Sequence, residues 1–331
     1  MGSNSFTSSF EKIPKALFLF LALVFCFEWA VCYFNRVPDY ALKKELIETE
    51  RIEAEVLFLG DSSATSNVDA ALFEEKTGLA MYGLGTLQWL GMPSYYLLFQ
   101  DYLQHQPAPR YLILMVTPET WTGDFGKRYS MYFEAYFSRS PLLFKILGQG
   151  LSPTLFFHYA VLDWLPSIRY RSYLQDVLFP DRRALLHKEF AHMSGARKDL
   201  ISRKGTSLME KGSQGFECFP PSKSYTANPV QLRYARKILA LAESRGIPVF
   251  YVAAPFAREC YTEAQVAELQ AIHGEVLEKN PGLEFIHILD LPLPKENFSN
   301  TSFHLHRGAA RIFTEKLAEF LVKALKHPAG G

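Results

Sequence analysis

The stretch "VLFLGDSSATSNVD", residues 56–69, decides the fold class of this chain. It begins with four apolar residues, which lead into a glycine, an aspartate and two serines. A short apolar run bounded by turn residues is typical of a strand in a parallel sheet that helices cover on both faces. Ser66 and Asp69 stand three residues apart, as in a capping box, and predict that a helix starts here. Residues 60–62 then form a loop that the helix does not require, and this loop can display a reactive side chain.

Apolar runs and helix-like segments alternate along the rest of the chain. Strands are predicted over residues 56–59, 79–85, 110–116, 247–253 and 283–289. Helices are predicted over residues 66–76, 93–104, 229–245, 263–279 and 308–325. This alternation predicts an α/β fold with an open, mostly parallel five-stranded sheet and helices on both faces, as in flavodoxin-like proteins.

An apolar segment near the N-terminus, "ALFLFLALVFCFEWAVCYF" at residues 16–34, contains one charge, Glu28. As a helix rising about 1.5 Å per residue, it would nearly cross a hydrocarbon core of about 30 Å. It predicts a single-pass membrane anchor over residues 16–35, between an N-terminal tail (1–15) and a charged stalk (36–54). A cleaved signal peptide is one rival, but no small-residue cleavage site follows the apolar run. A helix buried in a soluble protein is the other.

The remaining residues, 55–325, are predicted to form one α/β domain with an insertion over residues 123–228. There the alternation gives way to aromatic, apolar helices and then to a polar stretch. The insertion either caps the site, rests on the membrane or packs on the core as a helical subdomain. Cys218, within the insertion, and Cys260 have no C-x-x-C spacing, and they could form a disulfide outside the cytoplasm.

The composition limits the classes of partner. The 331-residue chain is 48% hydrophobic and 21% charged, which is enough to build a substantial core. Its formal net charge of +1 provides no basic field that would attract nucleic acid, so nucleic acid is not expected as a partner. His304 and His306 form a His-x-His pair without a third ligand at suitable spacing, so neither a metal nor a cofactor is predicted.

The residues at the carboxyl ends of parallel strands are the ones that bind ligands in an α/β sheet. Ser62, Gly85 and Thr117 occupy such positions, and His304 precedes the last helix. A serine at neutral pH needs a base within reach and donors for the oxyanion. Ser62 is therefore predicted to be the nucleophile and His304 the general base, with the backbone N–H groups of Ser62 and Gly85 facing the oxyanion. Asp61 is predicted to brace the turn by accepting backbone N–H groups.

Three segments resemble the SGNH or GDSL-type hydrolase superfamily: "FLGDSSA" at 58–64, "YGLGT" at 82–86 and "SFHLHRGAARIFTEKLAEFL" at 302–321. In that superfamily the first strand ends in Gly-Asp-Ser, and the histidine precedes the C-terminal helix. Together with the anchor, "LILMVTPETW" at 112–121 is similar to the membrane-anchored branch, which includes the teichoic-acid D-alanylation and alginate O-acetylation proteins. The resemblance implies a catalytic domain on the extracytoplasmic side of the cell membrane and a membrane-bound O-acyltransferase as partner.

The chain departs from the superfamily at the residue that orients the histidine. Thr301 stands where the superfamily usually carries Asp, three residues before His304. Asp290, Glu296 or a backbone carbonyl are the alternatives for holding the imidazole tautomer. The resemblance implies a membrane-anchored serine esterase or O-acyltransferase that forms an acyl-serine and acts on acyl esters of a cell-envelope glycan or polymer. The alternative is a catalytically inactive SGNH-like protein that assembles the envelope or binds glycan.

Overall fold

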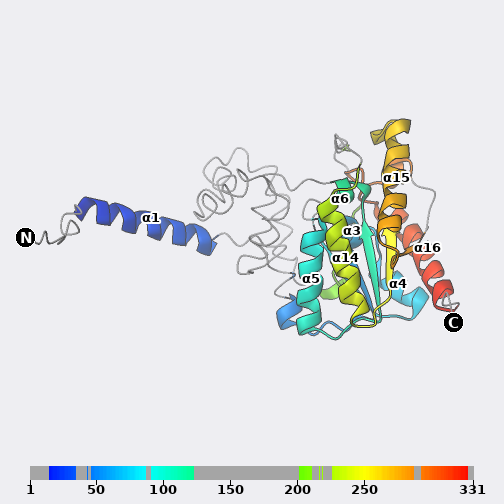
Figure 1. Cartoon of the computed structure of the whole chain (residues 1–331), viewed down its shortest axis with the longest axis horizontal. Helices are drawn as coiled ribbons and strands as arrows, with labels where there is room; N and C mark the ends of the chain where they lie inside the picture. Colours follow the sequence, from blue (N-terminus) through cyan, green and yellow to red (C-terminus); the bar gives the residue numbers. More distant parts are fainter. Residues whose placement is uncertain are drawn as a thin grey trace, which may run out of the picture.

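A parallel five-stranded sheet forms the centre of the described α/β domain (Figure 1). The computed structural model describes residues 15–34, 43, 46–86, 91–122, 201–210, 216, 218, 226–286 and 292–326. The strands are β1 (Val56–Gly60), β2 (Met81–Gly85), β3 (Tyr111–Val116), β4 (Val249–Ala253) and β5 (Glu284–Ile286). Their order is β2-β1-β3-β4-β5, and every neighbouring pair is parallel. The predicted α/β class and parallel sheet are confirmed.

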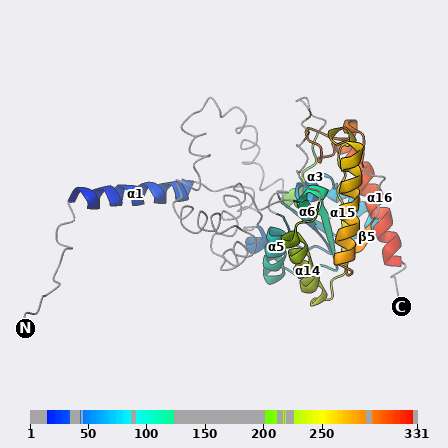
Figure 2. The same cartoon turned by 45° about the horizontal axis from the view of Figure 1, so that its top comes forward.

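Helices cover both faces of the sheet because successive strand residues point to opposite sides. Val56 and Phe58 belong to one apolar cluster, and Leu57 and Leu59 belong to the other. The first cluster includes α4 (Ala70–Thr77) and α16 (Arg307–Lys326); the second includes α5 (Gly91–His105), α14 (Pro229–Glu243) and α15 (Glu263–Lys279). In the turned view α5 and α14 lie side by side, away from α16 (Figure 2). Both strand faces are therefore dry, as their continuous apolar sequences predict.

The region after β1 differs from the predicted single helix. A short helix, α3 (Ser62–Ser66), begins directly at the end of the strand, with Asp61 as its N-cap. Asp69 does cap the next helix, α4, by accepting from the backbone N–H of Leu72, but the predicted partner in the capping box, Ser66, lies inside α3. The capping box is wrong because Asp69 is itself the N-cap of α4, while Ser66 ends the preceding helix, which Asp61 caps. Ser62 is therefore the first residue of a helix and does not lie in a free loop.

Three shorter helices lie between the strands and the longer helices of the domain. They are α6 (Pro118–Thr122), which follows β3, and the 3-10 turns η5 (Arg258–Cys260) and η6 (Lys295–Asn297). All three follow or approach the carboxyl ends of strands. They consequently build the rim on which an α/β site is expected.

A helix, α1 (Lys15–Phe34), occupies the apolar N-terminal segment. Several of its large apolar side chains are exposed, among them Phe20 and Phe25. Within the described residues, no helix meets the length and apolarity that a membrane span requires. The anchor over residues 16–35 stays a prediction, as do the domain boundaries.

Most of the predicted insertion, 123–228, lies outside the described residues, but two of its parts are placed. Residues 201–210, here called the strap, run along the edge strand β2, where the carbonyl of Lys204 accepts from the N–H of Gly83 at 2.8 Å. This contact covers a sheet edge that would otherwise offer unpaired backbone groups. Cys218 forms a disulfide with Cys260, next to the loop that follows β4. The insertion is thus fastened to the sheet domain at both places.

Candidate active site

Ser62 and His304 meet at the carboxyl end of β1. The Ser62 Oγ and His304 Nε2 atoms are 2.8 Å apart, although 242 residues separate them in sequence. Ser62 opens α3, and His304 lies in the loop before α16. Because β2 and β3 pair on opposite sides of β1, the order in which the strands are added reverses at this position, which is where such sheets bind ligands. The two predicted partners are within hydrogen-bond distance.

The carboxylate of Asp61 braces the turn that carries Ser62. Asp61 is completely buried, and its Oδ1 accepts from the backbone N–H and the hydroxyl of Ser63. Its Oδ2 accepts from the backbone N–H of Thr117 at 2.6 Å and from the hydroxyls of Thr117 and Thr120, each at 2.9 Å. Five donors thus converge on one buried carboxylate, which offsets its desolvation. Thr117 supports Asp61 through both of its donors.

Gly85 lies so close to α3 that no side chain fits. A Cβ on Gly85 would stand 2.2 Å from Thr65 Oγ1 and 2.5 Å from the carbonyl oxygen of Asp61. The carbonyl of Gly85 accepts a hydrogen bond from the ammonium group of Lys43, a buried stalk residue. The glycine is therefore required for the packing of α3 on β2. The oxyanion role of its N–H, and that of Ser62, stays a prediction.

The imidazole of His304 lacks the acid that usually orients such a ring. Its Nδ1 is buried and has no hydrogen-bond partner among the described residues, and the same holds for the Oγ1 of Thr301. Glu296 is exposed in η6 and does not hydrogen-bond to Nδ1, while Asp290 lies outside the described residues. Burial of the ring lowers the pKa of His304 to about 4, although the negative charge of Asp61 acts in the opposite direction. His304 is thus neutral over most of the accessible pH range.

Asn67, which the sequence did not single out, connects the two halves of the site. It is buried at the C-terminal end of α3. Its side-chain amide donates to the carbonyl of Phe303 at 2.9 Å and accepts from the N–H of Leu305 at 2.8 Å. These residues flank His304, so one side chain fixes the histidine loop to the helix that carries Ser62. From the sequence, an asparagine at this position predicts only the end of a helix, and no local signal points to its contacts with the histidine loop.

Replacing Asn67 with alanine is expected to lower the free energy of unfolding by about 2 kcal/mol or more, because two backbone groups lose their buried partner. If Ser62 and His304 act together, hydrolysis of a small acyl ester should also fall by about 100-fold, since small misplacements of reacting groups are costly. Urea unfolding and steady-state kinetics measure the two effects.

The matched control for Asn67 is Asn280→Ala. Asn280 is likewise a buried asparagine at a helix end, donating to the carbonyl of Val276 at 2.8 Å, but it terminates α15. This control should lose stability and keep ester hydrolysis. If both variants lost activity in the same proportion to their loss of stability, a positioning role for Asn67 would be refuted.

Glu119 is a second buried carboxyl group near this rim. The hydroxyl of Tyr261 donates to its Oε1, and its Oε2 is buried without a partner among the described residues. Burial raises the pKa of Glu119 to about 7, while the hydrogen bond from Tyr261 lowers it and the nearby charge of Asp61 raises it. The folded state therefore favours the protonated carboxyl group.

The free energy of unfolding should depend on pH through Glu119. Because the pKa is higher in the folded state than in the unfolded chain, its favourable contribution is complete below about pH 4 and is lost as the pH rises through about 7. The loss is at most about 3 kcal/mol. Glu119→Gln should flatten the pH dependence measured by urea unfolding, whereas Glu243→Gln, an exposed change, should not. Parallel curves for the wild type and Glu119→Gln would exclude this assignment.

His306 and a cluster of three side chains away from the site are the groups to consider as metal ligands. His306 Nδ1 accepts from the N–H groups of Gly308 and Ala309 at 3.1 and 3.3 Å, so this ring caps the start of α16. In the described part of the chain, three potential ligand atoms lie within 4.8 Å of one another, on Glu48, Asp101 and His105. None of these three belongs to the Ser62–His304 site.

Comparisons with known proteins find similarity to solved structures. The chain resembles a solved structure described as a "putative lipolytic protein of G-D-S-L family" from Desulfitobacterium hafniense DCB-2, with 10% identity and a TM-score of 0.39. The match covers 81% of this chain and 99% of the other. No protein-family model and no curated protein match the chain. The functional conclusion therefore rests on the geometry of the site.

Proposed function

We propose that the protein is a serine esterase or O-acyltransferase, anchored in the cell membrane, that acts on acyl esters of a cell-envelope glycan or polymer. The observation that carries the proposal is the 2.8 Å contact between Ser62 Oγ and His304 Nε2 at the carboxyl edge of the sheet. A neutral imidazole at this distance can take the proton of a serine hydroxyl. The resemblance of the Gly-Asp-Ser and histidine segments to SGNH hydrolases points to the same chemistry.

The reaction would proceed in two half-reactions. Ser62 Oγ attacks the acyl carbonyl while its proton passes to His304 Nε2, and the ester C–O bond then breaks as the leaving alcohol takes that proton. The acyl-serine is next attacked by water or by a glycan hydroxyl, whose proton passes to His304 and returns to Ser62. The N–H of Ser62, at the first position of α3, is not used within the helix and suits the oxyanion.

An extracytoplasmic location fits two features of the chain. Disulfides persist in oxidising compartments, and Cys218 and Cys260 form one. The exposed apolar side chains of α1 suit insertion into lipid, and the helix lies at the N-terminal side of the domain. We therefore place the catalytic domain outside the cytoplasmic membrane, with a membrane-bound O-acyltransferase as the partner that delivers the acyl group.

A specific observation favours a second function, a catalytically inactive SGNH-like protein that assembles the envelope or binds glycan. Thr301 replaces the usual acid, and the Nδ1 of His304 has no partner among the described residues. Without a carboxylate behind the imidazole, the imidazolium that forms during attack is less stabilised. The lowered pKa of His304 weakens the base in the same direction.

Labelling with a fluorophosphonate separates the two functions, because this reagent captures only an activated serine. We expect covalent capture at Ser62, identified by peptide mass spectrometry, and a labelling rate that falls as the pH drops through about 4 and His304 becomes protonated. His304→Gln should remove the labelling, whereas His306→Gln should keep it. Folded protein that is not labelled at any pH would support the inactive alternative.

A further inference from the structure

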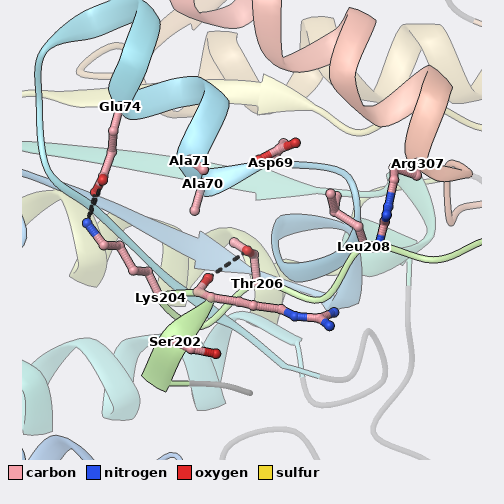
Figure 3. Close-up of a pocket in the computed structure, with 10 residues that line it drawn as sticks. Asp69, Ala70, Ala71, Glu74, Ser202, Lys204, Thr206, Leu208 and Arg307 are labelled. Atoms are coloured by element: carbon pink, nitrogen blue, oxygen red, sulfur yellow. Dashed lines mark hydrogen bonds and ion pairs between the residues drawn. The ribbon is translucent and has the colours of Figure 1, made fainter. Parts of the chain in front are cut away.

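A cavity of about 270 Å³ lies beside the candidate active site but does not include Ser62 or His304 (Figure 3). It is bounded by the first turn of α4, by the strap and by the first residue of α16. Its lining residues are Asp69, Ala70, Ala71, Glu74, Ser202, Arg203, Lys204, Thr206, Leu208 and Arg307. Three of them are cationic and two are anionic. The volume is below that of typical drug-sized pockets, so the cavity fits one small chemical group.

The two carboxylates of the cavity already have partners. Glu74 accepts from the ammonium of Lys204 with both oxygens at 2.5 Å, and also from the N–H of Met81 at 2.8 Å. This ion pair closes one end of the cavity in Figure 3. Asp69 caps α4 by accepting from the N–H of Leu72. Neither carboxylate is therefore available as the main attraction for a cation.

The guanidinium groups of Arg203 and Arg307 have weaker partners than the two carboxylates. Arg307 lies at the opposite end of the cavity, beside Leu208 (Figure 3), and pairs with Glu210 at 2.8 Å. That pair is 50% and 71% exposed, so it is weak and readily exchanged. Among the described residues, the guanidinium of Arg203 makes no hydrogen bond or ion pair, although its carbonyl accepts from Thr206 Oγ1. Guanidinium groups recognise carboxylates and phosphates through paired N–H donors.

We propose that this cavity is a binding site for a single small anionic group, a carboxylate or a phosphate monoester, held by Arg203 and Arg307. Thr206 lines the same cavity, and its hydroxyl holds the backbone of Arg203 by donating to that residue's carbonyl at 2.7 Å. The site is separate from the Ser62–His304 pair and does not depend on the proposed activity. An anion here would pair with the guanidinium of Arg203 and would compete with Glu210 for Arg307, whose ion pair is exposed.

Backbone hydrogen bonds connect the strap, which lines the cavity, to the elements of the candidate active site. The N–H of Ser207 in the strap donates to the carbonyl of Thr65 in α3 at 2.9 Å. Arg307 lies three residues after His304, and its backbone N–H donates to the carbonyl of Met209 in the strap at 2.7 Å. The strap therefore contacts both the helix that carries the serine and the segment that carries the histidine. A bound anion would fix the strap against both.

Isothermal titration calorimetry of the full chain in detergent, with inorganic phosphate and with galacturonate as probes, tests the site. We expect saturable binding of at least one probe and a loss of affinity of about tenfold or more in the double variant Arg203→Gln/Arg307→Gln. Arg311→Gln, an exposed change one turn along α16, is the matched control and should bind as the wild type does. Lys204 is kept, because it is paired with Glu74.

The two probes separate the sources of the anion. Binding of phosphate alone assigns the site to a phosphate monoester, binding of galacturonate alone assigns it to a carboxylate, and binding of both shows general anion recognition. The neutral sugar galactose should not bind. Equal affinity for galactose and galacturonate, no binding of either anion, or unchanged affinity in the double variant would each overturn the proposal. Fluorophosphonate labelling of the double variant should persist, so failure here is distinguishable from failure of the proposed activity.

Discussion

Ser62→Ala is expected to lower kcat/KM for hydrolysis of a small acyl ester by about 10⁴-fold or more. We expect alanine to keep the fold at this half-buried position, because the side chain of Ser62 makes a single hydrogen bond among the described residues, with His304. What is lost is the oxygen that attacks the acyl carbonyl. Steady-state hydrolysis of a chromogenic acetyl ester measures the effect, and acylation of the envelope glycan in cells measures it for a transferase.

Two further variants make the Ser62 experiment specific. Ser207 is an exposed serine in the strap, and its backbone N–H makes the hydrogen bond to α3. Ser207→Ala keeps this bond and should therefore leave hydrolysis unchanged. Combining Ser62→Ala with His304→Ala should cost little more than either change alone, because residues that act as a unit are not additive. Full hydrolysis and glycan acylation in Ser62→Ala would remove the basis of the proposed function.

Asp61→Ala is expected to have the largest effect on stability, a loss of about 3–5 kcal/mol in the free energy of unfolding. The change leaves five donors on Ser63, Thr117 and Thr120 without their acceptor in a site that water does not reach. Each unsatisfied buried donor is costly, and the N-cap of α3 is lost as well. Urea unfolding followed by circular dichroism measures the loss.

A matched acidic control separates this effect from a simple change of charge. Glu243→Ala removes an exposed carboxylate at the end of α14 and should alter the free energy of unfolding by less than about 0.5 kcal/mol. Asp61→Asn should lie between the two, because its amide retains one acceptor oxygen but presents donors to donors. An Asp61→Ala variant as stable as Glu243→Ala would show that the carboxylate does not brace the turn.

The sheet was predictable because its signal is local. Four of the five predicted strand ranges contain the observed strand, β1 extends one residue beyond its predicted range, and the helix predicted over residues 263–279 coincides with α15. The predicted partners Ser62 and His304 also meet, since residues at the carboxyl ends of parallel strands share one edge. Strand and helix patterns depend on residues that are neighbours in the sequence, so they can be recognised in a single sequence.

Most other contacts between distant parts of the chain were not predictable from the sequence alone. The role of Asn67 depends on backbone groups of Phe303 and Leu305, and no local pattern pairs positions so distant. Thr117 was placed at the site, but its function as a donor to Asp61 needed the geometry of α6. The Ser66 capping box was wrong for the converse reason, since a local motif matched while Asp61 already started the helix.

The separation of 242 positions between Ser62 and His304 also has a consequence for biosynthesis. If the two residues act together as proposed, a growing chain carries its serine through most of its synthesis without the general base. The pair can form only after the loop that carries His304 has been made and has docked on Asn67. Truncated products should therefore not hydrolyse esters, and the proposed activity would report chains in which both ends of the domain have come together.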